Sequence, residues 1–95
     1  MYAVFVEVNA TEAHSEAARE FLPRVAVPGA RGAGATGGYW LEAQGGRGVS
    51  IVVFETEDEA RNAAAMFRVG EPPMQDAPEG VTVKTVEVRE VLAAL

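Results

Sequence analysis

The sequence contains no cysteine and only one histidine, and both facts narrow the chemistry that is open to this protein. Without cysteine there are no disulfides, no thiolate nucleophile and no thiolate ligand for a metal ion. A single histidine and scattered carboxylates are a poor ligand set for zinc or another transition metal. We therefore expect no metal site.

Basic residues are also scarce, because 8 lysines and arginines stand against 14 acidic residues and give a net charge of −6. Binding to nucleic acid needs a basic face that neutralises phosphates, so nucleic acid is not an expected partner. No apolar run is long enough to span a bilayer, and no basic segment with an apolar run behind it opens the chain, so no membrane partner is expected. The expected location is the cytoplasm, and the length predicts a single domain over residues 1–95.

The clearest structural signal is the stretch Gly37–Thr56, which predicts two strands joined by a tight turn. Side chains alternate across a pleat over residues 39–44 and again over 49–55. Gly45 and Gly46 lie between them, and glycine tolerates the positive φ that a two-residue hairpin turn requires. Both strands carry apolar side chains on both faces, which is unusual for a sheet with one face in water.

The first helix is expected between the first strand and this hairpin. Thr11 or Ser15 is its candidate N-cap. Because Pro23 removes a helical hydrogen bond and clashes one turn back, we expect a kink or an ending near Leu22. A glycine-rich loop over residues 28–38 follows and contains G-x-G-x-x-G. In a dinucleotide site that motif follows a strand and opens a helix, whereas here it follows a helix and opens a strand, so we exclude a nucleotide site.

The second helix begins with a capping box, in which Thr56 accepts an amide proton of the first turn and Glu59 reaches back. We expect this helix to continue to about Arg68. In the last strand, residues 81–91, the valines change phase near Lys84. An alternating strand cannot change phase without an extra residue, so we expect a β-bulge there.

The order strand, helix, strand, strand, helix, strand predicts an α+β fold of the ferredoxin-like β-α-β-β-α-β type with an antiparallel four-stranded sheet. Two helices can cover only one face of such a sheet. We expect them over an aliphatic face formed by Val4, Val6, Leu41, Val49, Ile51 and Val53. The other face is expected to carry Phe5, Trp40, Val52 and Phe54 among polar residues. An apolar patch of that size favours a second copy of the chain packed against it.

Several structural motifs of the chain resemble the antibiotic-biosynthesis-monooxygenase-like family. They are the G-G-Y-W-L strand, the G-R-G turn, the strand that closes with an aromatic residue and Glu55-Thr56, and the acidic helix start. Members of that family are dimeric α/β barrels, so the resemblance implies a homodimer.

The wider superfamily includes cofactor-free oxygenases of polycyclic aromatic substrates, haem-degrading enzymes and many proteins without an assigned activity. The resemblance implies a protein that binds a small, largely apolar or aromatic molecule, with cofactor-free monooxygenation as its activity. Haem is disfavoured, because the haem-degrading members place their axial histidine on the other helix, which contains no histidine here.

Three residues are candidate catalytic groups on this hypothesis: His14 as a base, Tyr39 as a hydrogen-bond donor to a substrate carbonyl, and Trp40 as a stacking surface. The candidate ligand-binding residues are Asn9, Trp40 and Phe54. Four of these residues have a structural alternative. His14 can be a solvated histidine at a helix end, and Tyr39 a half-buried strand tyrosine. Trp40 can be an aromatic anchor in a core or interface, and Asn9 can make an Asx turn.

Three charged residues complete the candidates. Glu7 and Glu42 are expected on the aromatic face, where desolvation would let either act as a general base. The alternative for both is pairing with arginine or lysine at the rim of an interface. Arg47, at the hairpin tip, is expected either to clamp an anion or to remain solvated.

The alternative to an enzyme is a non-catalytic dimeric binding or interaction domain. One structural feature distinguishes the two hypotheses. A cavity of roughly a few hundred Å³ that contains Trp40, Tyr39 or His14 favours the enzyme. A space between sheet and helices that is filled by side chains favours the non-catalytic domain.

Overall fold

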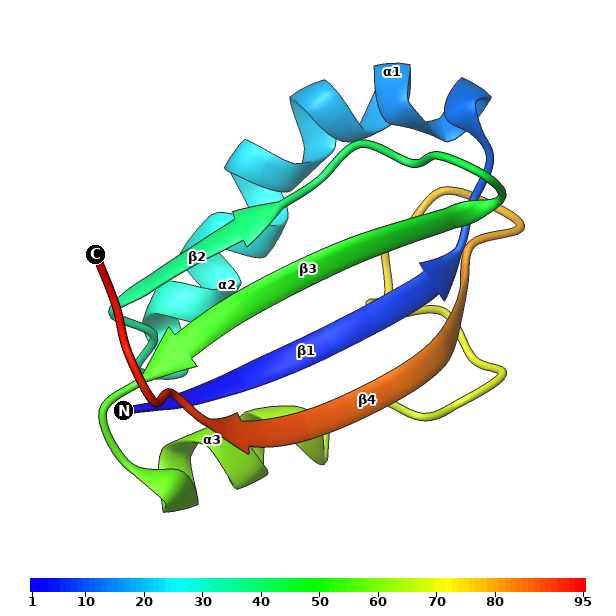
Figure 1. Ribbon diagram of the computed structural model, residues 1–95. Helices are drawn as coiled ribbons and strands as arrows, with labels where there is room; N and C mark the ends of the chain where they lie inside the picture. The colour runs from blue at the N-terminus through cyan, green and yellow to red at the C-terminus, as the bar shows by residue number, and fades with distance from the viewer.

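The computed structural model describes all 95 residues and contains one four-stranded sheet with its helices on one face (Figure 1). The strands are β1 (Tyr2–Asn9), β2 (Gly37–Trp40), β3 (Arg47–Phe54) and β4 (Thr82–Glu90). Their order in the sheet is β2-β3-β1-β4, and all neighbouring strands are antiparallel. The α+β class and the antiparallel four-stranded sheet are thereby confirmed, and the arrangement is compatible with a ferredoxin-like fold.

The β2–β3 hairpin turns where the sequence predicts. Gly45 and Gly46 have φ angles of 62° and 80°. Around them, Gln44 and Arg47 exchange two backbone hydrogen bonds of 2.9 and 3.1 Å. A side chain at either glycine would be strained at these angles, so the glycine pair fixes the length of the turn and with it the register of the two strands.

β4 contains the predicted bulge. Glu7 pairs with Thr85, whereas the next residue, Val8, pairs with Val83, so Lys84 has no partner on β1. Because of this extra residue, the valines on both sides of the bulge face the helices, and Val83 is fully buried.

α3 (Glu57–Ala64) begins with the predicted N-cap. The backbone N–H of Glu59 donates to Oγ1 of Thr56 at 3.2 Å, and the Thr56 hydroxyl donates to Oε1 of Glu59 at 3.0 Å. The threonine oxygen thus satisfies one of the unpaired N–H groups of the first turn. The helix ends at Ala64, about one turn before the predicted end at Arg68.

Replacing Thr56 by alanine is expected to lower the free energy of unfolding by about 1 kcal/mol, the usual cost of losing an N-cap oxygen. Urea denaturation followed by circular dichroism measures the change, and Thr56→Ser, which keeps the hydroxyl, is the matched control. An alanine variant that unfolds at the same urea concentration as the unmodified protein would show that this cap does not stabilise the fold.

The first helix is longer than the sequence predicts. α1 (Glu12–Phe21), the π-helical segment η1 (Leu22–Ala26) and α2 (Val27–Gly32) follow one another without a break, and we call them together the arm. Pro23 lies in the first turn of η1, where wider turns accommodate its missing N–H. Of the two outcomes predicted near Leu22, a kink or an ending, the ending is wrong: the helix continues, and only its α-helical geometry gives way to a π-helical segment there. The predicted loop is wrong as far as Gly32.

Strand pairing corrects the predicted assignment of the two sheet faces. Directly opposed residues of antiparallel strands share a face. Val4 lies opposite Val52, and Trp40 lies opposite Ser50. The helix-covered face is formed by Tyr2, Val4, Val6, Val8, Trp40, Ser50, Val52, Phe54, Val83, Val86 and Val88. The open face, which has no helix over it, carries Ala3, Phe5, Glu7, Tyr39, Val49, Ile51, Val53, Thr85 and Glu87.

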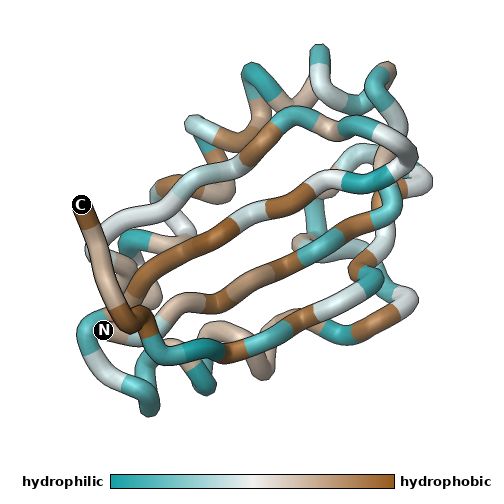
Figure 2. Tube along the Cα trace, viewed as in Figure 1, coloured by the Kyte–Doolittle hydropathy of each residue, from teal (hydrophilic) through white to brown (hydrophobic).

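The prediction was right for Val4, Val6 and Phe5. It was wrong for Trp40, Val52 and Phe54, which lie under the helices, and for Val49, Ile51 and Val53, which do not. Figure 2 shows hydrophobic residues along the strands in the middle of the sheet. Because both faces are apolar, alternation alone cannot indicate which one the helices cover.

The packed core lies between the sheet and α3. It is a cluster of six buried residues: Val4, Val6, Phe54, Ala60, Ala63 and Val83. Alanine on α3 lets the helix lie close to the strands, so this half of the molecule is densely packed. The arm contributes no residue to the cluster.

Candidate functional site

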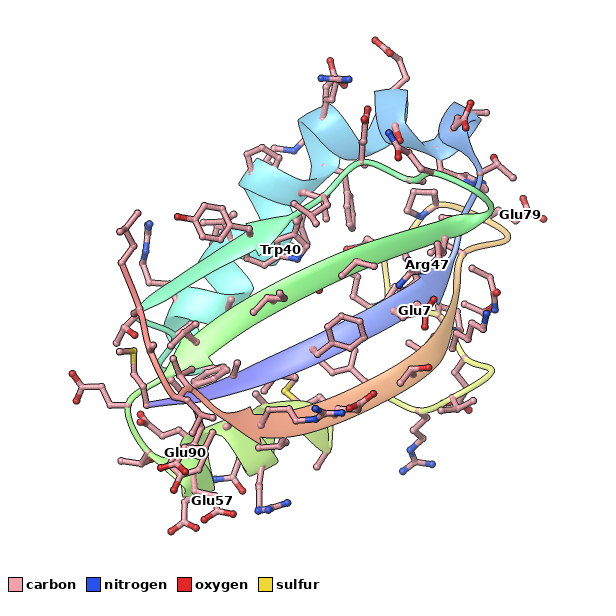
Figure 3. All side chains as sticks on the ribbon, viewed as in Figure 1. Glu7, Trp40, Arg47, Glu57, Glu79 and Glu90 are labelled. Atoms are coloured by element: carbon pink, nitrogen blue, oxygen red, sulfur yellow. The ribbon has the colours of Figure 1, made fainter.

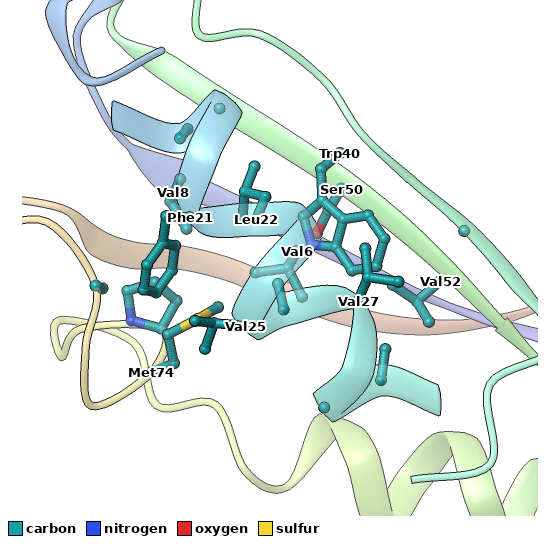
Figure 4. Close-up of a pocket in the computed structure, with 18 of the residues that line it drawn as sticks. Val6, Val8, Phe21, Leu22, Val25, Val27, Trp40, Ser50, Val52 and Met74 are labelled. Atoms are coloured by element: carbon teal, nitrogen blue, oxygen red, sulfur yellow. The ribbon is translucent and has the colours of Figure 1, made fainter. Parts of the chain in front are cut away.

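A large apolar cavity separates the arm from the sheet (Figure 4). Its volume is about 1080 Å³, and 25 of its 37 lining residues are hydrophobic. Figure 4 shows Val6, Val8, Ser50 and Val52 from the sheet, Phe21, Leu22, Val25 and Val27 from the arm, and Met74 from the loop before β4. A space of this size and character is typical of a site for an apolar small molecule.

The cavity exists because the arm and α3 approach the sheet differently. α3 places Ala60 and Ala63 directly on the strands, where both are buried. In the arm only Ala26 is buried, although the apolar side chains of Phe21 and Val25 line the cavity on the side of the arm that faces the sheet. The arm therefore forms a wall over an unfilled space rather than a second packed layer.

Trp40 is the largest side chain in the cavity wall. It extends from β2 on the helix-covered face and lies beside Val27 of the arm (Figure 4). Its indole is half-buried and offers a flat apolar surface to the cavity. Phe54 also lines the cavity, but with 1% of its surface exposed it is part of the packed core.

His14 lines the cavity at the N-terminal end of the arm. The backbone N–H of Thr11 donates to Nδ1 at 2.9 Å, and Nε2 lies 3.2 Å from the carbonyl oxygen of Glu79. Because a carbonyl oxygen can only accept, the proton is assigned to Nε2 and the lone pair to Nδ1. Both ring nitrogens are thus engaged with the main chain, and neither is free to take a proton from a ligand.

Tyr39 and Asn9 lie apart from the cavity interior. Tyr39 borders the cavity, but it precedes Trp40 on β2, so its side chain points to the open face beside Ile51 and is 75% exposed. Asn9, at the end of β1, does not line the cavity, and its Nδ2 donates to Oγ1 of Thr82 at 3.3 Å. Of the predicted site residues, His14, Trp40 and Phe54 line the cavity, Tyr39 lies at its border with its side chain on the open face, and Asn9 lies outside.

Glu7 and Arg47 form an ion pair on the open face (Figure 3), with 2.5 Å between Oε2 and Nε. The hydrogen bond from Arg47 lowers the pKa of Glu7 below its ordinary value of 4.5. Partial burial opposes this change, while the charges of Arg47 and Lys84 and a hydrogen bond from Thr85 add to it. Glu7 is therefore an ion-pair partner rather than a general base. Glu42 lines the cavity instead, so the two carboxylates do not form one site.

Replacing Glu7 by glutamine is expected to lower stability at neutral pH and to make stability less dependent on pH in acid. Folding lowers the pKa of Glu7, so its contribution is present above about pH 4.5 and is lost as the pH falls through the lower folded-state pKa. Urea midpoints at pH 7 and between about pH 5 and 2.5 measure both effects. Glu20→Gln, at an exposed residue without an ion pair, is the control. Equal acid slopes for Glu7→Gln and the unmodified protein would contradict the prediction.

The structure groups no three histidine, aspartate or glutamate side chains as ligands around a possible metal position. None of its helices has both the length and the apolar character needed to cross a lipid bilayer. Comparison with family models, with curated proteins and with solved structures gives no match to this chain. The cavity and the open face are therefore the features from which a function can be inferred.

Proposed function

We propose that this protein binds a small, largely apolar or aromatic molecule in the cavity between the arm and the sheet. The observation that carries the proposal is the cavity itself, with its volume of about 1080 Å³ and its mostly hydrophobic lining. The apolar side chains around a space of this size lack protein packing contacts on one side, which is unfavourable. A ligand restores those contacts, and Trp40 gives an aromatic ligand a surface on which to stack.

Cofactor-free monooxygenation is the activity that the family resemblance supports. In that chemistry an electron-rich phenol loses its proton and the anion reacts with oxygen, so the protein supplies a dry pocket, a stacking surface and a proton acceptor. Trp40 corresponds to the stacking surface, and the mostly hydrophobic lining of the cavity makes it an apolar pocket. Glu42 is the one carboxylate among the lining residues and is the candidate acceptor.

A non-catalytic binding domain is the second candidate, and the contacts of His14 favour it. Both nitrogens of this imidazole are held by the main chain. An enzyme of this kind would more readily use a histidine that has one nitrogen free to exchange a proton with the substrate.

The open face is the surface through which two copies of the chain form a homodimer. Its apolar residues Phe5, Val49, Ile51 and Val53 have no layer over them in a single chain. Packing two such faces about a two-fold axis buries both patches and produces the two-sheet barrel that the resemblance implies. The apolar tail, residues 91–95, extends past the ends of β1 and β3 (Figure 1) and contacts the second copy.

The emission of Trp40 tests ligand binding, because Trp40 is the only tryptophan. Titration with the neutral probe N-phenyl-1-naphthylamine should quench this emission to saturation at one probe per chain. Val25→Phe, which fills the cavity from the arm, should weaken binding by about tenfold or more, whereas the exposed change Arg61→Ala should not. No saturable quenching in the unmodified protein would contradict the proposal.

Oxygen consumption separates the two candidates. With 1-naphthol as substrate and a chelator present, consumption that depends on the protein and is lost in Glu42→Gln supports the oxygenase. Saturable binding of 1-naphthol without oxygen consumption supports the non-catalytic domain.

A further inference from the structure

The arm is attached to the packed core less firmly than α3, the other helix on this face of the sheet. Ala26 is its only buried residue, and neither core cluster contains a residue of the arm. α3, in contrast, contributes Ala60 and Ala63 to the main cluster. Segments with few buried apolar contacts open at a low free-energy cost while the rest of the domain stays folded.

Two side-chain hydrogen bonds hold the arm to the rest of the chain, and both are in its first turn. Nε2 of His14 donates to the carbonyl oxygen of Glu79 at 3.2 Å, and the backbone N–H of Ala43 donates to Oγ of Ser15 at 3.1 Å. The remaining side-chain bonds of the arm are to its own N-cap, Thr11, and none of the three ion pairs involves it. We call the bonds from His14 and Ser15 the latch.

The latch joins the arm to two different loops at one end of the cavity. Ala43 belongs to the β2–β3 connection, and Glu79 belongs to the loop before β4, which also supplies Met74 to the cavity wall. His14, Ser15 and Ala43 themselves line the cavity. Breaking the latch therefore separates the arm from the other walls where they meet.

η1, which joins α1 to α2, is a natural bending point of the arm. A π-helical segment within an α-helix marks a local weakness of the hydrogen-bond ladder, and Pro23 lacks one of its donors. Leu22 and Val25 line the cavity on this segment, and Trp40 faces it from β2 (Figure 4). Bending at η1 with the latch broken would move α1 away from the sheet and open to solvent the cavity that the Trp40 indole lines.

We infer that the arm is the movable wall of the cavity, that it bends at η1, and that the His14–Ser15 latch controls the rate at which a ligand enters and leaves. The inference rests on the proposed function, because the ligand is the one that occupies this cavity. It also gives His14 a role that its engaged ring nitrogens fit better than that of a base.

Stopped-flow fluorescence with N-phenyl-1-naphthylamine tests the latch in the double variant His14→Ala with Ser15→Ala. Each hydrogen bond of this type changes an opening equilibrium by about two- to tenfold, so association and dissociation rates should both rise by about tenfold. The dissociation constant should change by less than about threefold, because the latch is the same with and without ligand. Without probe, acrylamide should quench Trp40 more strongly in the variant. Arg61→Ala, which removes the bonds to Glu57 on α3, is the matched control.

A removable cross-link provides the opposite test. The chain has no cysteine, so Ser15→Cys with Ala43→Cys introduces a single disulfide at the latch. The oxidised variant should bind and release the probe more slowly than the same protein after reduction. This comparison uses one folded sample and does not depend on the stability of the alanine variant.

Three results overturn the inference, and they are distinguishable. Unchanged rates in both variants, with normal probe affinity, contradict the latch and leave the proposed function in place. Faster release without faster association would show that His14 and Ser15 hold the ligand rather than the arm. Failure of the unmodified protein to bind any apolar probe contradicts the proposed function, and the latch with it.

Discussion

Replacing Phe54 by alanine should lower the free energy of unfolding by about 3–5 kcal/mol. Phe54 is the largest fully buried side chain of the protein and packs in the main cluster with Val4 and Ala60. Removing the ring forfeits its burial and leaves a hole that β3 and α3 cannot close without disturbing their own hydrogen bonds. Since domains of this size are stable by about 5–15 kcal/mol, the loss is a large share of the total. Urea denaturation followed by circular dichroism measures it.

Two control variants test whether the loss of stability comes from the buried ring of Phe54. Phe54→Leu keeps most of the apolar volume and should cost less than half as much. Val69→Ala removes an apolar side chain that is 70% exposed and should change stability by less than about 0.5 kcal/mol. If Phe54→Ala altered self-association but not the stability of the single chain, Phe54 would lie on the open face and the register of β1 and β3 would be incorrect.

Local signals predicted the elements of this fold well. The Gly45–Gly46 turn, the Thr56 cap and the bulge at Lys84 each depend on residues within a few positions of one another. Backbone angles and short-range hydrogen bonds decide such features, and the identity of two or three residues is enough to specify them.

The sheet faces could not be predicted in the same way, because they depend on how distant strands pair. Val52 and Val53 are both apolar, and only the pairing of Val4 with Val52 decides which of them lies under the helices. A shift of one residue would exchange the two faces completely. When both faces of a strand are apolar, the hydrophobic pattern gives no preference for either register.

The cavity wall could not be predicted from the sequence either. The four-residue spacing of Phe21 and Val25 indicates an apolar stripe, but such a stripe looks the same whether it meets side chains or an empty space. The continuation of the helix past Pro23 added Val27 to the wall, opposite Trp40. Met74 comes from an irregular loop, in which periodicity carries no information.

Replacing Ile51 by aspartate should convert the proposed homodimer into a monomer at micromolar concentration while leaving the fold intact. Ile51 lies in the middle of the open face, opposite Phe5 on β1 and Tyr39 on β2, and is 41% exposed in the single chain. Two sheets packed face to face would bury this position in both copies. An aspartate there would lose its hydration without gaining a partner, which costs several kcal/mol. Because each 1.4 kcal/mol is a factor of ten, the dissociation constant should rise by about a hundredfold or more.

Sedimentation velocity between about 1 and 100 µM distinguishes monomer from dimer at the micromolar concentrations of this prediction. Val69→Asp introduces the same charge at an exposed apolar residue outside the open face and should leave the dimer unchanged. If the unmodified protein is monomeric throughout this range, the homodimer is refuted, and with it the barrel that the resemblance implies. A dimer that persists in Ile51→Asp would mean that the copies associate elsewhere. The exposed apolar tail, tested by Leu92→Asp, is then the surface to examine, because Leu92 is 90% exposed and has no layer over it in the single chain.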